Sequence, residues 1–221
     1  MAQYTVPNQP EPHEVARENA FPPIASPAPL GLNVLAFVTA IIGCYYAGFI
    51  VPYAALRLHI PIGAVLLIAG IIMVLAGMWE YRKNSMLTAT IFTSYGGFIT
   101  ALGLVFILSF GILLNLTGVA LLTGFLGLLF LCWTIFSGVL LLGTLRTNAS
   151  LVIMMALLFV AYLLLTIGFL TAARPLVIAG GWVAVACGLF SWIAAIASIL
   201  GSETRRAFFR LPLGERIAAI E

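Results

Sequence analysis

Long apolar runs alternate with short polar connections along most of this chain. Six runs approach the length of about 20 residues that an α-helix needs to cross a bilayer core of about 30 Å. They are Leu30–Ile50, Ile62–Trp79, Met86–Phe110, Val119–Leu142, Leu151–Leu170 and Leu176–Leu200. None contains Asp, Glu, Lys, Arg or His, and none alternates every second residue as a barrel strand does. The pattern predicts an all-α membrane protein with six transmembrane helices in one compact bundle.

Composition supports this class and excludes others. Of the 221 residues, 63% are hydrophobic and 8% are charged, whereas a soluble domain has roughly 25% charged residues. Because so few charges cannot cover the surface of a soluble globule, lipid must surround most of the chain. A net charge of +3 with a single Lys argues against nucleic-acid binding. The widely spaced Cys44, Cys132 and Cys187 are typical of small hydrophobic residues rather than of a disulfide framework.

The two ends of the chain differ from its middle. Residues 1–25 hold five Pro and three Glu without apolar periodicity, which predicts a disordered tail and not a signal peptide. Residues 26–200 form the predicted transmembrane domain, and residues 201–221 a basic segment expected to be a short surface helix. With both termini inside, the inner side holds eight Lys or Arg residues and the outer side two, Arg57 and Arg174. This bias predicts a multi-pass protein of the cytoplasmic (plasma) membrane with both termini in the cytoplasm.

The chain offers no recognisable catalytic or metal-binding set. His13 lies in the tail and His59 in an expected outer loop, each alone, and no paired carboxylates or metal-ligand spacing appear. We therefore expect no enzyme activity, no cofactor and no metal. One acid, Glu80, lies at a helix end. It is either an interfacial residue paired with Arg82 or Lys83, which we favour, or a substrate or proton gate at the inner mouth.

Small residues recur at helical spacing in three of the apolar runs. These repeats are Ala36, Ala40, Gly43 and Ala47, then Gly63, Gly70 and Gly77, and finally Ala184, Gly188, Ser191, Ala195 and Ser198. Small residues let helix backbones approach closely in lipid. Packing within one molecule is the simpler interpretation, but the repeats exceed what we expect one bundle to need. We therefore expect some of them to join subunits of an oligomer.

Hydroxyl and aromatic side chains are the remaining chemistry of the membrane interior, since it holds no ionisable group. Three helical faces combine them with Leu: Leu35, Thr39, Ile42 and Tyr46; Thr88, Tyr95, Leu102 and Phe106; Leu151, Leu158, Tyr162 and Leu165. Such faces either form ordinary core or line a narrow pore with apolar constrictions. The residues alone therefore leave two functions open, a pore for a small, weakly hydrated solute and a non-transporting scaffold or sensor.

Two motifs resemble a known family. The first run begins within Ser26-Pro27-Ala28-Pro29-Leu30-Gly31-Leu32, and the third contains Phe92-Thr93-Ser94-Tyr95-Gly96. They resemble the acetate uptake transporter family, the acetate–succinate permeases of bacteria, archaea and fungi, over roughly Ser26 to Gly201. The helix-start motif comprises Ser26, Pro27, Pro29 and Gly31. Ser26 replaces the family's Asn, and its hydroxyl can still cap a helix.

The resemblance implies a homo-oligomer, a hexamer, in which each subunit carries its own pathway for acetate and related small carboxylates such as succinate. It also implies an apolar constriction at Leu35, Tyr95 and Leu158, with Leu35 in place of the family's Phe. Hydroxyls can donate to the carboxylate there without a buried charge. The polar lining expected beside the constriction is Thr39, Thr93, Ser94 and Tyr162. Without an acid in the membrane interior, a channel-like monocarboxylate permease is favoured over a proton relay.

The charge bias gives a testable topology. Single cysteines introduced near His59 and near Arg206, in a variant without the native cysteines, should react with a membrane-impermeant reagent from opposite sides of the membrane. The site near Arg206 should be the cytoplasmic one, because the inner side carries the excess of basic residues. Labelling of both sites from the same side would contradict six crossings.

Overall fold

The computed structural model describes residues 25–49, 59–109 and 114–210, with side chains omitted for 114–120 and 202–210, and its regular structure is helical. The helices are α2 (Ala28–Ala47), α3 (His59–Arg82), α4 (Met86–Leu108), α5 (Leu114–Thr144), α6 (Ala149–Leu170) and α7 (Arg174–Arg210). Each contains a stretch long and apolar enough to cross a membrane, and no strand occurs among the described residues. The predicted all-α, six-helix architecture is confirmed.

The predicted end segments lie mostly outside the described residues, which exclude 1–24 and 211–221. The exception is the first part of the basic segment. Helix α7 continues without a break from the membrane span to Arg210. Residues 201–210 therefore prolong the sixth helix, and the expected separate surface helix is not found there.

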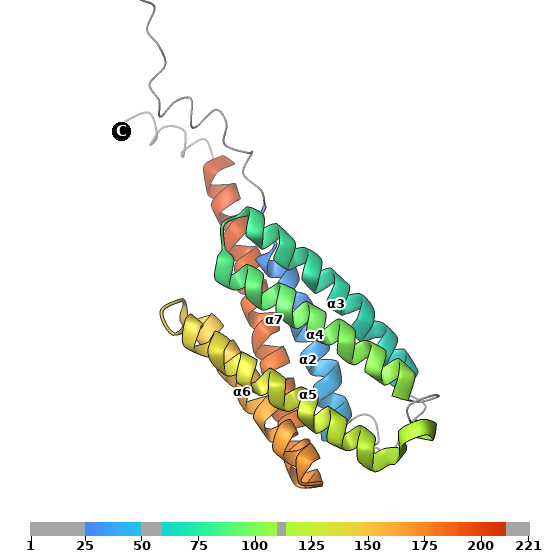
Figure 1. The fold of residues 1–221 in the computed structure, drawn as a ribbon. Coiled ribbons are helices and arrows are strands. Elements are labelled where there is room, and N and C mark those ends of the chain that lie inside the picture. Colours follow the sequence, from blue (N-terminus) through green and yellow to red (C-terminus); the bar gives the residue numbers. More distant parts are fainter. Residues whose placement is uncertain (1–24, 50–58, 110–113, 211–221) are drawn as a thin grey trace, which may run out of the picture.

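The helices are arranged in closely packed pairs. Helix α3 packs most extensively on α4, α2 on α7, and α5 on α6, while α6 also packs on α7. Helix α2 lies in the middle of the bundle, and it begins at the same end at which α7 finishes (Figure 1). We call this the inner end, and the end where α3 begins the outer end. Direct backbone contacts between α4 and α5 are few, so side chains fill the space between these two helices.

Glycines set the distance between α3 and α4. A Cβ added to Gly70 would lie 2.6 Å from the carbonyl oxygen of Gly96, and one added to Gly103 would lie 2.7 Å from the carbonyl oxygen of Gly63. Such distances are shorter than real Cβ atoms tolerate, so any side chain at these positions would push the helices apart. The glycine repeat of α3 thus meets α4 along most of its length.

Helices α2 and α7 are joined in the same way. A Cβ added to Gly43 would lie 2.8 Å from the carbonyl oxygen of Gly181, and one added to Gly188 would lie 2.9 Å from that of Ala36. These small-residue repeats are therefore used within one molecule. The expectation that they exceed the needs of one bundle is wrong, because close backbone packing, rather than the hydrophobic effect, must hold helices together in lipid.

Adjacent glycines of α4 provide a matched test of this packing. Gly96 faces the backbone of α3, whereas a Cβ added to Gly97 would have nothing within 4 Å. Gly96→Ala should lower the thermal unfolding midpoint in detergent, with a cost of about 1–3 kcal/mol or more from overpacking. Gly97→Ala should leave the midpoint unchanged or raise it slightly, because Ala favours helix. Equal midpoints for the two variants would contradict backbone contact at Gly96.

Candidate functional site

Three residues from three helices belong to the same buried hydrophobic core. Leu35 of α2, Tyr95 of α4 and Leu158 of α6 have exposed fractions of 0%, 0% and 1%. The structure thus brings the three predicted constriction residues into the same core cluster. Because all three are buried, side chains close the core at these positions. We call Leu35, Tyr95 and Leu158, with the side chains that contact Tyr95, the central layer or central cluster.

Tyr95 carries the polar group of this layer. Its hydroxyl is hydrogen bonded to the hydroxyl of Ser137 on α5, with 2.7 Å between the oxygens. Its ring stacks on Tyr162 of α6 with centroids 6.2 Å apart, and it meets Trp133 of α5 edge to face at 5.7 Å. The Tyr95 hydroxyl is therefore held by one hydrogen bond in otherwise apolar surroundings, as buried polar groups require.

Helix α5 supplies residues that the sequence analysis missed. Phe98 of α4 stacks on Trp133, with ring centroids 4.3 Å apart and the planes 8° from parallel. Aromatic rings therefore fill the space between α4 and α5. A signal for this face was present in the sequence, because four hydroxyl or aromatic residues of α5 recur every seventh position, which places them on one helix face. They are Thr123, Phe130, Ser137 and Thr144, and the last three are fully buried.

A column of aromatic rings leads from the central layer toward the outer end. Tyr162 stacks on Phe130 at 5.9 Å, and Phe130 stacks on Phe169 at 5.8 Å. Phe169 in turn meets Tyr46 edge to face at 5.5 Å. Each such pair adds about 0.5–1.5 kcal/mol beyond the burial of its area. The packed rings therefore stiffen the interior of this half of the bundle.

His59 does not lie alone in an outer loop, as the sequence analysis expected. It is the first residue of α3 and is partly buried. Its Nε2 forms a short hydrogen bond with the Tyr45 hydroxyl, and its ring meets Phe106 edge to face at 5.3 Å. The prediction was wrong because α3 begins three residues before the apolar run that starts at Ile62.

A cavity of about 330 Å³ lies on the inner side of the central layer. Leu32, Phe92 and Met154 line it, and each lies about one helical turn from a constriction residue on its helix. Polar side chains also line this cavity, namely Thr88, Asn148, Ser150 and Ser198. The inner cavity thus brings hydroxyl and amide groups close to the central cluster.

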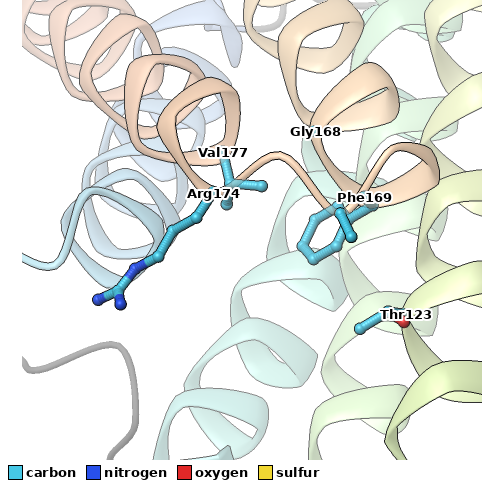
Figure 2. Close-up of a pocket in the computed structure, with 6 residues that line it drawn as sticks. Thr123, Gly168, Phe169, Arg174 and Val177 are labelled. Carbon is cyan, nitrogen blue, oxygen red and sulfur yellow. The ribbon is translucent and has the colours of Figure 1, made fainter.

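A smaller cavity of about 190 Å³ lies near the outer end, beside the turn between α6 and α7 (Figure 2). Phe169, Thr123 and Val177 line it together with Arg174. Figure 2 shows that the guanidinium of Arg174 extends away from Phe169 and Thr123. Because Phe169 belongs to both this cavity and the aromatic column, the column connects the outer cavity with the central layer.

The four hydroxyl residues expected to line the pathway are divided in the structure. Tyr162 lies in the central cluster beside Tyr95. Thr39 donates to the carbonyl oxygen of Leu35 at 2.8 Å, and its Oγ1 lies 3.0 Å from the position of a Cβ on Gly188 of α7. The Thr93 hydroxyl lies against Gly77 in the contact between α3 and α4. Ser94 is partly buried. Thr39 and Thr93 therefore lie at helix contacts.

The helix-start motif is tied to α3 at the inner end. Pro27 is the residue that precedes α2, and its carbonyl oxygen accepts the N–H of Gly31 at 3.1 Å. Pro29 occupies the first turn, where its missing N–H costs nothing. Contrary to the expectation from the sequence, the hydroxyl of Ser26 does not cap the helix. It accepts a hydrogen bond from Lys83 Nζ at 3.0 Å instead.

Lys83 also reaches a buried acid. Its Nζ lies 3.8 Å from Oε1 of Glu80, whose side chain is only 2% exposed. Among the described residues, no group donates a hydrogen bond to this Oε1. The pairing with Lys83 is the favoured interpretation of Glu80, and the carboxylate is buried within the protein. No cluster of three or more His, Cys, Asp or Glu side chains that could hold a metal lies within the described part of the chain.

Comparison with known proteins finds consistent matches. Residues 8–214 match the GPR1/FUN34/yaaH family. The chain is 30% identical over 203 residues to acetate permease A of Emericella nidulans, covering 86% of this chain and 65% of the permease. It is 28% identical over 193 residues to the succinate-acetate/proton symporter SatP of Escherichia coli, covering 87% of this chain and 96% of SatP. The solved structure of the bacterial acetate channel SatP matches with a TM-score of 0.70 and 28% identity, covering 82% of this chain and 95% of that one. The resemblance indicated by the two motifs is confirmed.

The buried acid makes the inner ion pair testable. Lys83→Met removes the positive charge beside Glu80, so it should destabilise the protein by about 1–3 kcal/mol. Adding Glu80→Gln to this variant should restore part of the loss, because no uncompensated charge is then buried. Arg82→Met is the control, since Arg82 is exposed and lies over the Trp79 ring. Thermal unfolding in detergent measures all three, and equal losses for Lys83→Met and Arg82→Met would contradict this role.

Proposed function

Because this chain belongs to the GPR1/FUN34/yaaH family, we propose that it is a membrane channel or permease for acetate and related small carboxylates, succinate among them. It is a transport protein and not an enzyme. The observation that carries the proposal is the buried cluster of Leu35, Tyr95 and Leu158 between an inner and an outer cavity, in a fold shared with an acetate channel. The alternative of a non-transporting scaffold or sensor leaves this arrangement without a role.

The proposed pathway runs from one cavity to the other through the apolar constriction formed by Leu35, Tyr95 and Leu158. Moving a carboxylate out of water costs several kcal/mol even after the protein relaxes, so the layer must return part of that energy. The Tyr95 hydroxyl can donate to the carboxylate, while the two Leu side chains contact the methyl group. Inorganic anions of similar size lack the methyl group and gain less from this apolar ring. The constriction therefore selects acetate because this anion has one polar and one apolar end.

Passage is proposed to be channel-like. The constriction contains no acid or base that could carry a proton, and the buried Glu80 lies at the inner end of α3 beside Lys83. We assign this ion pair to holding the helix-start motif in place. The dependence of flux on pH then arises mainly from titration of the transported acid itself.

The proposal extends to assembly and location. We infer a homohexamer in the cytoplasmic (plasma) membrane, with one pathway in each subunit and both termini in the cytoplasm. The eight-to-two distribution of basic residues supports the orientation. Outward-facing apolar side chains of α5, such as Leu121, Ile135 and Leu142, offer surface for lipid or for a second subunit, with exposed fractions of 68%, 63% and 69%.

Flux of labelled acetate and succinate into proteoliposomes tests the function and the constriction together. Wild-type protein should move acetate without an imposed pH gradient. Tyr95→Ala removes a ring and a donor, so it should reduce the preference for acetate over succinate by about ten-fold, as loss of one hydrogen bond predicts. Leu35→Phe narrows the layer and should slow succinate more than acetate.

Two controls separate selectivity from stability. Leu104→Phe makes the same change on an exposed face of α4, where the Leu104 side chain is 46% exposed, and should leave the preference unchanged. Fluxes are divided by the amount of folded protein, because a merely structural effect of Tyr95→Ala would lower both fluxes in proportion. Unchanged preference in both constriction variants, at normal folded yield, would place the constriction elsewhere.

A further inference from the structure

Trp133 of α5 carries a buried polar group that the packing leaves unused. Among the described residues, its indole N–H has no hydrogen-bond acceptor. The ring itself is firmly held, stacked on Phe98 and in edge-to-face contact with Tyr95. Native structures leave few buried donors unpaired, and such a group calls for a water, a ligand or a functional role.

Ser137 provides a second donor close to the first. Positions 133 and 137 are one turn apart on α5 and therefore share a face. Ser137 is fully buried, and its hydroxyl is paired with that of Tyr95. Two hydroxyls carry two protons, but the hydrogen bond between them uses only one. The pair therefore retains one O–H that can donate to a third group.

The neighbouring threonine bonds differently from Ser137. Thr134 donates to the carbonyl oxygen of Phe130, one turn back on its own helix, at 2.7 Å. Such a bond is the usual way to satisfy a hydroxyl inside an apolar helix. Thr134 also lies 3.1 Å from the hydroxyl of Thr166 on α6. Ser137 instead turns to Tyr95, so its remaining donor capacity stays in the central cluster.

We propose that Trp133, Ser137 and Tyr95 together bind the carboxylate group of the transported acid. This inference rests on the proposed function and deepens it, because it assigns two further specificity-determining residues on α5. An ionised carboxylate accepts hydrogen bonds on both oxygens, so it can use the indole N–H and the free hydroxyl proton at once. Phe98 stacks on Trp133 and Tyr162 stacks on Tyr95, so apolar rings lie beside these donors and suit a ligand with an apolar end.

The chemistry of the three donors also suits transport. All are neutral, so the site can hold an anion without a buried cation that would bind it tightly. Conduction needs binding that is strong enough to admit the ion and weak enough to release it. Donors without a nearby acid discriminate against cations, and among the described residues the only buried acidic side chain is Glu80, at the end of α3 beside Lys83.

Nuclear magnetic resonance of full-length protein labelled with ¹⁵N-tryptophan in lipid nanodiscs tests the site directly. The chain has four Trp residues, Trp79, Trp133, Trp182 and Trp192, and Trp133→Phe identifies the indole signal of Trp133. Titration with acetate should shift this signal to saturation, whereas chloride at the same ionic strength should not. The signal of Trp182, which is 47% exposed, is the internal reference.

Flux measurements provide the second arm. Trp133→Phe keeps an aromatic ring against Phe98 and removes the N–H, so the half-saturation concentration for acetate should rise about ten-fold or more. Trp182→Phe is the matched control and should not change it. Ser137→Ala should raise the half-saturation concentration as well, and in this variant the Trp133 signal still reports acetate directly. If Trp133→Phe does not fold, the half-saturation concentration of Ser137→Ala decides the matter, because it needs no signal assignment.

The outcomes separate this inference from the function on which it rests. Absence of acetate flux in the wild-type protein would overturn the proposed function. Normal acetate flux with an unmoved Trp133 signal and an unchanged half-saturation concentration in Ser137→Ala would overturn the carboxylate site alone. In that case water satisfies the indole N–H and the transport function stands.

Discussion

Backbone-to-backbone contact at glycine is the constraint on which the rest of this structure depends. Gly70 and Gly96 bring α3 onto α4, and Gly43 and Gly181 bring α2 onto α7. Helices that approach so closely leave no room for large side chains between them. Aromatic residues are therefore displaced to the faces where helices stand further apart. The wider space between α4 and α5 collects rings such as those of Phe98 and Trp133.

The polar groups of this space are few and mostly paired with one another. Tyr95 pairs with Ser137 and Thr134 with Thr166, in each case across two helices. These hydrogen bonds satisfy buried hydroxyls without introducing charge, so the layer stays apolar. In the Thr134–Thr166 pair both protons are used, because Thr134 also donates to the carbonyl oxygen of Phe130, whereas the Tyr95–Ser137 pair retains one O–H. This remaining O–H is one of the neutral donors that we propose for the carboxylate.

Charge is confined to the ends of the bundle, where it holds segments in place. Lys83 joins the buried Glu80 to Ser26 just before α2 begins, which links the helix-start motif to the turn between α3 and α4. Glu80 and Ser26 both bind this one cation. Glu80 depends on it because a buried carboxylate is stable only with compensation nearby. The inner end of α2 is therefore fixed relative to α3 and α4, while the central layer is built from neutral groups.

The sequence by itself determined the six helices, the small-residue repeats and the family motifs. These features are local, since the length of an apolar run and its spacing need no partner to be recognised. The three residues of the predicted constriction also lie in the one buried core. Only the tertiary structure decided which hydroxyls lie near them. Thr39 and Thr93 lie at glycine contacts. Tyr95 instead contacts Ser137 and Trp133, which belong to α5, a helix that the sequence analysis gave no role in the pathway. The physical reason is that helical spacing shows which residues share a face, but the glycine contacts between helices set which face turns toward the pathway.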